Sequence, residues 1–466
     1  MKFPKGSKGQ SPAPDGPAAR PEDTRPPARW MFTYGLQHIL AMYAGVITPP
    51  IIIAEAVGLD GTETAMLISA ALLVSGLGTL LQTLGLWRFG AQLPLVIGTS
   101  FVPVSAMTGI GQSSGLPAVF GAAIAAGVFG LVAVPFVASL IRFFPPLVTG
   151  TVITVIGVTL LPVAVGWIQD DPGSGAPSTP ALAMAGGTLA TILILSKVLP
   201  GVWSRMAILI GLVLGTLGAA AFGQVDPSEV GEGPVFSVGQ PLYFGAPEFQ
   251  LAAIVTMCVV MIVILAEGVA DILAVGQVVG TKVDGRRLAD GLRADAATAV
   301  VGPFLNSFPG STFSQNVGLI ALNRVRSRHV VAVGGGILVT MGLFPHLGQV
   351  VAMVPSPVLG GAGLVLFGSV AAAGIRTLSE VGFDGNHNLM IVAVSMAFGV
   401  LPIAAPDFFT AFPEWAEMIL HSGIVTAAVS ALLLNAFFNL WGSSADPAED
   451  PDPGEKKAAD GGGRRD

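Results

Sequence analysis

Two acidic residues lie four positions apart in the apolar stretch ILAEGVADILAVG. If that stretch is helical, Glu267 and Asp271 project from the same face. A carboxyl group inside a membrane is costly unless it is paired, protonated or hydrated, and this suits it to carry a proton. No basic residue lies in the same stretch to form an ion pair with Glu267. We therefore predict that Glu267 takes part in binding or in proton coupling.

Three further ionisable residues occur near apolar segments. Asp290 begins such a segment in RLADGLRADAATAV, Asp295 lies further in, and His38 lies in GLQHILAMYAG. Arg287 and Arg293 are close enough in sequence to pair with the aspartates, and Asp290 is also a suitable N-cap. A structural role is therefore the stronger interpretation for both aspartates. For His38, packing and function are equally well supported.

The composition places these residues in a membrane. Of the 466 residues, 52% are hydrophobic and 11% are charged, and the mean hydropathy is +0.74. Apolar windows of about 18 residues, long enough to cross a hydrocarbon core about 30 Å thick, recur along the chain. The predicted fold class is therefore an all-α polytopic membrane protein. We predict up to fourteen spans, near 33–54, 64–86, 92–108, 117–139, 146–166, 181–198, 205–222, 249–278, 290–302, 315–323, 330–349, 356–374, 388–404 and 421–441.

The 22 lysines and arginines support an even number of spans. Six precede residue 30 and four follow residue 441. The others lie in or beside loops that follow even-numbered windows, whereas the loops after odd-numbered windows contain none. Because cytoplasmic loops are enriched in Lys and Arg, we predict that both termini are cytoplasmic. The expected location is the plasma or inner membrane.

Neither end of the chain is typical of a folded domain. Residues 1–29 and 442–466 are rich in Pro, Gly and charge, so we expect two disordered cytoplasmic tails. The net charge of −7 comes largely from the tails and outer loops, and it does not indicate nucleic-acid binding. The single cysteine, Cys258, excludes disulfides and thiolate metal sites. We expect neither a metal site nor a signal peptide.

The chain contains two related halves. PLVTGTVITVIG (146–157) matches PVLGGAGLVLFG (357–368) at an offset of 211, and GTSF (98–101) matches GSTF (310–313) at an offset of 212. Two gapless matches at nearly the same offset indicate a duplication of about seven spans. Because seven is odd, the two copies have opposite orientations in the membrane. The basic residues that flank the matched segments agree with this inversion.

Each half also carries a broken span at an equivalent place. LPLVIGTSF (93–101) and FPGSTFS (308–314) are rich in Pro, Gly and polar residues. Irregular backbone at membrane depth is stable only where protein buries it or a cavity hydrates it. Inverted repeats with such breaks are typical of secondary transporters, which bind substrate where the breaks meet. We predict short extended pieces in spans 3 and 10, and a half-helix that starts near Gln315 and directs its N–H groups at a ligand.

These segments resemble the nucleobase/ascorbate transporter family of cation symporters. SQNVGLIALNR (314–324) is similar to the family signature of Gln/Glu-Asn-x-Gly, four residues, Thr and a basic or small residue. GLQHILAMYAG, LPLVIGTSF, AEGVADI and PSPVLGGAGLVLFGSVAAAGIR resemble the first, third, eighth and twelfth spans of the family. The resemblance implies two inverted seven-span repeats and usually a homodimer. It also implies a core domain at 30–141 and 249–352 and a gate domain at 142–222 and 353–441.

The resemblance further implies the roles of individual residues. Glu267 and Gln315 would hold the substrate. The residues lining the same pocket would be Ser100, Phe101, Val102, Ser314 and Asn316. The supporting network, which serves proton coupling, would comprise Asp271, Asp290 and His38. Asn323 stands where the family usually has Thr, at a position tied to selectivity.

A nucleobase suits these side chains. A carboxylate accepts from a ring N–H, an amide both donates and accepts, and Phe101 offers an aromatic face. The resemblance implies uptake coupled to protons, or to sodium in some members. Purine carriers of the family resemble this chain in having Gln at position 315, whereas uracil carriers tend to have Glu. We therefore expect a permease for xanthine or uric acid, and a uracil permease is the alternative.

Two other functional classes fit the sequence less well. An anion transporter on the same plan would direct its half-helix dipoles at an uncharged or basic site, which disagrees with Glu267. An intramembrane enzyme would need a zinc pair or a Ser/His constellation, and neither occurs at workable spacing. We therefore expect a transporter that is not an enzyme and has no cofactor beyond its co-transported ion.

Overall fold

The computed structural model describes residues 20–136, 145–169, 176–225, 236, 239–313, 319–320, 325–384, 387–413, 416–417, 420 and 422–440. In the first half of the chain the regular elements are α1 (Ala28–Ala56), α2 (Gly61–Leu84), β1 (Ile97–Thr99), α3 (Val104–Ala133), α5 (Pro146–Ile168), α6 (Thr179–Val198), α7 (Val202–Arg205) and α8 (Ala207–Ala221). In the second half they are α9 (Leu251–Val279), α10 (Gly285–Val301), β2 (Gly310–Thr312), α12 (Arg328–Gly342), α13 (Pro345–Ala352), α14 (Ser356–Leu378), α15 (Asn388–Ala404) and α17 (Gly423–Asn435).

Many of these helices are long and apolar enough to cross a membrane. The helices long and apolar enough to cross a membrane are α1, α2, α3 with the turn that follows it, α5, α6, α9 and α14. The shorter apolar helices are α8, α12, α15 and α17. The predicted class, an all-α multi-pass membrane protein with short extended pieces, is confirmed. The count of fourteen spans stays a prediction.

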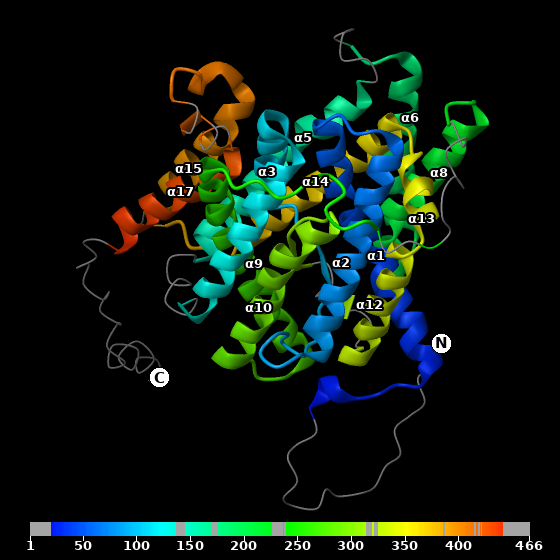
Figure 1. The fold of residues 1–466 in the computed structure, drawn as a ribbon, viewed down its shortest axis with the longest axis horizontal. Helices are drawn as coiled ribbons and strands as arrows, with labels where there is room; N and C mark the ends of the chain where they lie inside the picture. The colour runs from blue at the N-terminus through cyan, green and yellow to red at the C-terminus, as the bar shows by residue number, and fades with distance from the viewer. Residues whose placement is uncertain are drawn as a thin grey trace, which may run out of the picture.

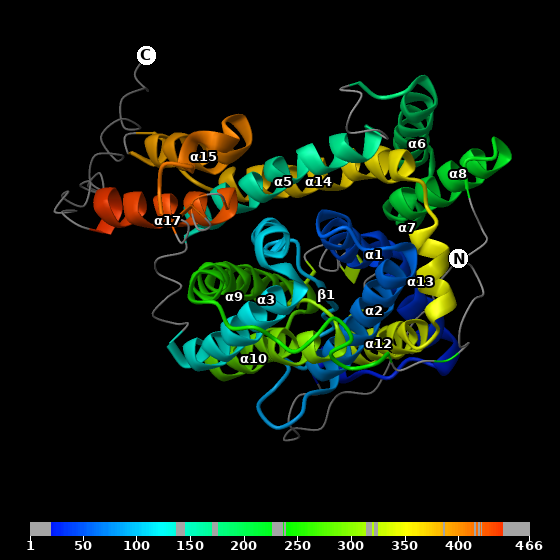
Figure 2. The same ribbon diagram turned by 45° about the horizontal axis from the view of Figure 1, so that its top comes forward.

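The helices form two bodies, which lie one above the other in Figure 2. The strand body contains α1, α2, α3, α9, α10, α12, α13 and both strands. The panel contains α5, α6, α7, α8, α14, α15 and α17 (Figure 1). Most packing occurs within a body, as between α2 and α12 or between α5 and α14. Contacts between the bodies are sparser and involve chiefly α1, α3 and α9 on the strand body.

Glycines allow the two helices of the duplicated motif to pack closely. A Cβ on Gly157 of α5 would lie 2.2 Å from the backbone nitrogen of Ala371 on α14. Near the start of α5, a Cβ on Gly150 would lie 3.0 Å from the backbone nitrogen of Leu378, at the end of α14. The two helices are therefore antiparallel and touch through their backbones, as small residues allow inside membranes. This arrangement agrees with the inverted orientation of the two copies.

The N-terminal boundary differs from the predicted one. The predicted tail extends to residue 29, but Pro21–Asp23 form a 3-10 turn and α1 begins at Ala28. Glu22 is fully buried, and its carboxylate lies 2.6 Å from the guanidinium of Arg287 at the start of α10. Asp23 pairs in the same way with Arg328 at the start of α12. These ion pairs hold residues 20–27 against the strand body, which the composition of the segment does not reveal.

Two helix boundaries also differ. Residues 109–116, which lie between the predicted spans 92–108 and 117–139, are mostly helical, because α3 is interrupted only at Gly115, whose φ is 78°. That backbone conformation favours glycine and lets the helix bend without a long loop. At α10 the N-cap is Asp284, whose side chain accepts from the N–H of Arg287. Asp290 is therefore inside the helix and is not its N-cap.

Candidate functional site

The two predicted extended pieces pair with each other. β1 and β2 are antiparallel, with Gly98 opposite Ser311 at the centre of the register. The pairing extends beyond both strands, because the N–H of Ser100 donates to the carbonyl of Pro309 at 3.0 Å. At the other end the N–H of Phe313 donates to the carbonyl of Val96, also at 3.0 Å. The break of each half thus supplies hydrogen-bonding groups to the break of the other half.

Threonine side chains complete the hydrogen bonding at the outer edges of the strand pair. The N–H of Ile97 donates to the hydroxyl of Thr79 on α2 at 3.0 Å. The N–H of Gly310 donates to the hydroxyl of Thr298 on α10, also at 3.0 Å. Unpaired amide groups are costly inside a membrane, so these bonds explain how irregular backbone persists there. Both threonines are buried.

Glycine makes room for an aromatic ring over the strand pair. A Cβ on Gly98 would lie only 2.6 Å from the ring of Phe313. A Cβ on Gly45 of α1 would lie 3.1 Å from the same ring and 3.8 Å from the ring of Phe101. Phe101 and Phe313 therefore lie on the α1 side of the strands, and both are buried.

Two acidic residues from neighbouring helices meet beside β2. The hydroxyl of Thr312 lies 3.3 Å from each carboxylate oxygen of Asp295, which is fully buried in α10. A Cβ on Gly268 of α9 would lie 2.9 Å from Asp295 Oδ2, so this carboxylate packs against the turn that carries Glu267. Glu267 is the residue next to Gly268 in the sequence, so α9 and α10 bring two acidic residues to the same region beside β2. In the described part of the chain no basic side chain pairs with either one.

Three of the predicted pocket residues follow β1 directly in the chain. Ser100, Phe101 and Val102 are buried and connect β1 to α3. The hydroxyl of Ser100 accepts from the N–H of Val102 at 3.3 Å. Phe101 packs edge-on against Phe367 of α14, with the ring centroids 6.2 Å apart. Phe101 is thus a residue of the candidate site that contacts the panel.

The predicted supporting residues are less concentrated than expected. Asp271 is buried one turn beyond Glu267 on α9, and His38 is fully buried in α1. The carboxylate of Asp290 lies 2.5 Å from the guanidinium of Arg293. Arg88 and Arg286 are each 3.9 Å from it. The structure therefore places Asp290 in an ion-pair cluster and Asp295 beside Glu267.

Helical geometry explains why Asp290 and Asp295 have different neighbours. Residues three or four apart share a helix face, so Asp290 and Arg293 lie together on α10. Asp295 and Thr298 share a different face, which packs against α9 and β2. The sequence does show Asp295 inside an apolar segment, but proximity in sequence to Arg293 favoured a structural pair. Thr79 and Thr298 were hard to identify as hydrogen-bond partners of the strands from the sequence. The only indication was a polar residue at a similar place in each half.

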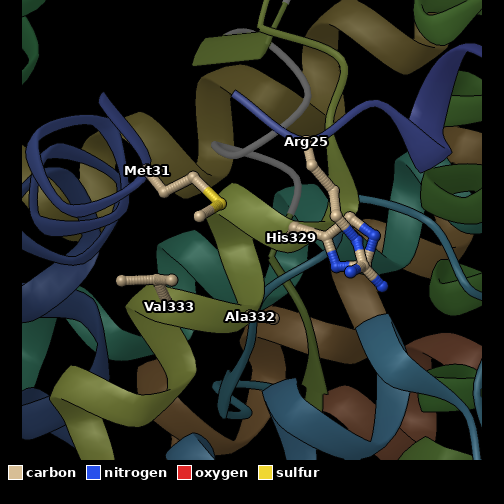
Figure 3. Close-up of a pocket in the computed structure, with 5 residues that line it drawn as sticks. All are labelled: Arg25, Met31, His329, Ala332 and Val333. Atoms are coloured by element: carbon tan, nitrogen blue, oxygen red, sulfur yellow. The ribbon is translucent and has the colours of Figure 1, made fainter. Parts of the chain in front are cut away.

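Four predicted residues, Ser314, Gln315, Asn316 and Asn323, lie outside the described residues. The described chain reaches Phe313, immediately before them. A separate hollow lies between the start of α1 and α12; Figure 3 shows Arg25 and His329 together on one side of it, with Met31 and Val333 on the other. It shares no residue with the strand pair and carries basic side chains instead of carboxylates. We therefore place the candidate site at the strand pair.

The match to known proteins is extensive. Residues 29–408 match the model of a group described as the Permease family. This chain belongs to that permease family. The match confirms the resemblance to nucleobase/ascorbate transporters drawn from the motifs.

Named relatives of this permease are similar over most of their length. It is 39% identical to the uric acid permease PucJ of Bacillus subtilis (strain 168), over 88% of this chain and 93% of the relative. It is 38% identical to the xanthine permease of the same organism, over 91% and 97% of the two chains. Its fold resembles the transmembrane domain of the cyanobacterial bicarbonate transporter BicA, with a TM-score of 0.61 and 13% identity. That likeness covers 86% of this permease and 97% of the BicA domain, and it shows a shared inverted-repeat fold.

Proposed function

We propose that this permease carries a purine nucleobase, xanthine or uric acid, into the cell together with protons. The observation that carries the proposal is the pair of carboxyl groups, Glu267 and Asp295, beside the paired strands. The relatives at 39% and 38% identity are named for uric acid and xanthine. A permease of this kind moves its substrate without changing it, so the chain is a transport protein and not an enzyme.

The paired carboxyl groups support proton coupling. Two neighbouring carboxyl groups in an apolar interior resist carrying two negative charges at once, because burial and mutual repulsion both disfavour the second charge. Such a pair can gain or lose a proton as its exposure changes, and Glu267 can accept a hydrogen bond from a ring N–H only while it is ionised. Binding of a base and movement of a proton would therefore be linked at one place. Asp271, one turn away on α9, would support this network.

The aromatic rings support a flat substrate. Phe101 is the second residue after β1, and Phe313 is the first residue after β2. A base between them and Glu267 would combine stacking with an in-plane hydrogen bond. The family resemblance implies that Gln315, two residues beyond Phe313 in the sequence, supplies the second in-plane partner. This combination of a ring face and two in-plane groups suits a nucleobase better than a small inorganic anion.

The division into two bodies supports alternating access. We identify the strand body with the core domain, predicted at 30–141 and 249–352, and the panel with the gate domain, predicted at 142–222 and 353–441. Ser100, Phe101 and Val102 are buried. A substrate could reach them only if the bodies move relative to each other. We further propose that both termini are cytoplasmic and that the permease works as a homodimer, as the family resemblance implies.

Uptake of radiolabelled xanthine and uric acid tests the substrate. We expect uptake of at least one purine in cells that express the permease, with unlabelled purines competing better than uracil. Bicarbonate and sulfate should not compete, although the fold is shared with a bicarbonate transporter. If uracil bound more tightly than every purine, the chain would be a pyrimidine permease. If only anions competed, the nucleobase proposal would be wrong.

Glu267→Gln tests the carboxylate. The amide cannot carry the charge that the proposal assigns to position 267, so uptake should be lost while the protein still reaches the membrane. Wild-type uptake by this variant would remove Glu267 from the mechanism. Coupling is tested separately, by imposing a sodium gradient at constant pH. Faster uptake under that gradient would replace proton coupling with sodium coupling.

A further inference from the structure

A side-chain hydrogen bond joins the two bodies at one edge of their interface. Glu55 lies in the last turn of α1, on the strand body, and Trp167 lies in the last turn of α5, on the panel. The indole N–H of Trp167 donates to the carboxylate of Glu55. Trp167 is only 2% exposed, whereas Glu55 is exposed. The hydrogen bond therefore links the buried ring of Trp167 on the panel to the exposed carboxylate of Glu55 on the strand body.

Aromatic rings connect this bond to the candidate site. The ring of Trp167 lies 6.1 Å from that of Phe367 on α14, centroid to centroid. Phe367 is fully buried and packs edge-on against Phe101, with centroids 6.2 Å apart. Glu55 and Phe101 belong to the strand body, and the two rings between them belong to the panel. A movement between the bodies must therefore break or rearrange both ends of this series of contacts.

We propose that Glu55 and Trp167 form a latch that closes the outer side of the permease, and that Phe367 links the latch to substrate at Phe101. The proposal rests on the proposed function, because it requires the bodies to move apart during transport. It also uses the predicted orientation, in which α1 and α5 both end on the outer side.

The chemistry of the contact suits repeated opening. A hydrogen bond to a charged acceptor is stronger than a neutral one, but water can replace each partner once the bodies separate. Opening therefore leaves no polar group unsatisfied. Contact of substrate with Phe101 would hold Phe367 in place and so favour the closed arrangement of the latch, as a ligand that binds one state better shifts the population toward it.

The single cysteine of the chain permits a direct test. In a Cys258→Ala background, Thr48→Cys places a thiol seven residues before Glu55, and hence about two turns deeper on the same face of α1. A membrane-impermeant maleimide applied to intact cells then reports how often the outer side opens. Trp167→Phe and Glu55→Ala each remove the bond, and we expect labelling to become roughly tenfold faster. Glu55→Gln keeps an acceptor and should label slowly.

Controls separate the latch from general loosening. Trp30→Phe makes the same chemical change at the opposite end of α1 and should leave labelling unchanged. Xanthine or uric acid should slow labelling in the parent but not in Phe367→Leu. Equal labelling rates for the parent, Trp167→Phe and Glu55→Ala would overturn the latch proposal. If substrate still slowed labelling in Phe367→Leu, Phe367 would not link the latch to the substrate.

Binding to the purified permease distinguishes the two proposals. If detergent-solubilised parent protein binds purines but the latch variants label like the parent, the latch fails and the proposed function stands. If the parent binds neither xanthine nor uric acid, the proposed function fails. Faster labelling of the latch variants would then still support a contact between two moving bodies.

Discussion

Thr79 of α2 and Thr298 of α10 make equivalent contacts in the two halves of the chain. Each hydroxyl accepts from the N–H of the first residue of a strand, Ile97 or Gly310, at 3.0 Å. The hydroxyl of Thr79 also lies 3.2 Å from the carbonyl of Ile97, and that of Thr298 lies 3.3 Å from the carbonyl of Gly310. The strand pair is therefore braced from both sides by helices of its own repeats.

Replacing either threonine by valine should destabilise the permease. Valine keeps the shape but leaves a buried N–H without a partner, which costs about 1–3 kcal/mol. Thr79→Ser and Thr298→Ser retain the hydroxyl and are the matched controls. Thermal unfolding in detergent should separate each valine variant from its serine control. Equal unfolding temperatures would show that the strand edges do not depend on these hydroxyls.

Asp295→Asn and Asp290→Asn should have different effects although both residues lie on α10. Asp295 lies beside Glu267, so its neutral analogue should abolish proton-driven uptake. Asp290 pairs with the surrounding arginines, so Asp290→Asn should lower stability but keep the pH dependence of uptake. Uptake measured across a range of pH for both variants checks this assignment. If Asp290→Asn lost proton coupling and Asp295→Asn kept it, Asp290 would have the proton-coupling role that the family resemblance implies.

Glu22→Gln should cost far more stability than Asp23→Asn. The carboxylate of Glu22 is fully buried, and removing one partner of a buried ion pair typically costs about 3–5 kcal/mol. The side chain of Asp23 is 44% exposed, and pairs of that kind contribute about 0.2–1 kcal/mol. Thermal unfolding of the two variants gives the comparison. Similar losses would mean that the 3-10 turn at residues 21–23 is not anchored mainly through Arg287.

Gln315→Glu should weaken binding of xanthine or uric acid and admit uracil. A glutamine amide donates as well as accepts, whereas an ionised glutamate only accepts and suits the second ring N–H of uracil. One unpaired buried group costs about 1–3 kcal/mol, so the preference should shift by roughly tenfold to a hundredfold. Competition for labelled xanthine uptake by unlabelled bases measures this shift. An unchanged order of competitors would place the selectivity elsewhere.

Much of the fold was predictable because membranes impose simple rules on sequence. Apolar length indicated α9 at 249–278, and the helix is Leu251–Val279. The repeated GTSF and GSTF motifs indicated two equivalent breaks, and the structure pairs them as β1 and β2. Both predictions depend on local composition or on internal similarity. Neither needs knowledge of which side chains meet.

The features that the sequence did not reveal depend on which side chains meet in the fold. Composition marked residues 20–29 as a tail, but the ion pair between Glu22 and Arg287 links positions 265 residues apart in the chain. Asp290 and Asp295 look alike in sequence, and only the helical phase and the neighbours of α10 separate them. Sequence spacing fixed neither the register of the strands nor the threonines that brace them, because long-range packing determines both.

The pairing of β1 with β2 also has a consequence for biosynthesis. Ile97 and Gly310 are separated by 213 residues (310 minus 97). At roughly 5–20 residues per second, the ribosome completes β2 on the order of ten to forty seconds after β1. During that interval the inner edge of β1 has no partner strand, although α2 and its threonine are already present. The first half of the permease must therefore wait in the insertion machinery, or in a partly hydrated form, until the second half arrives to complete its backbone.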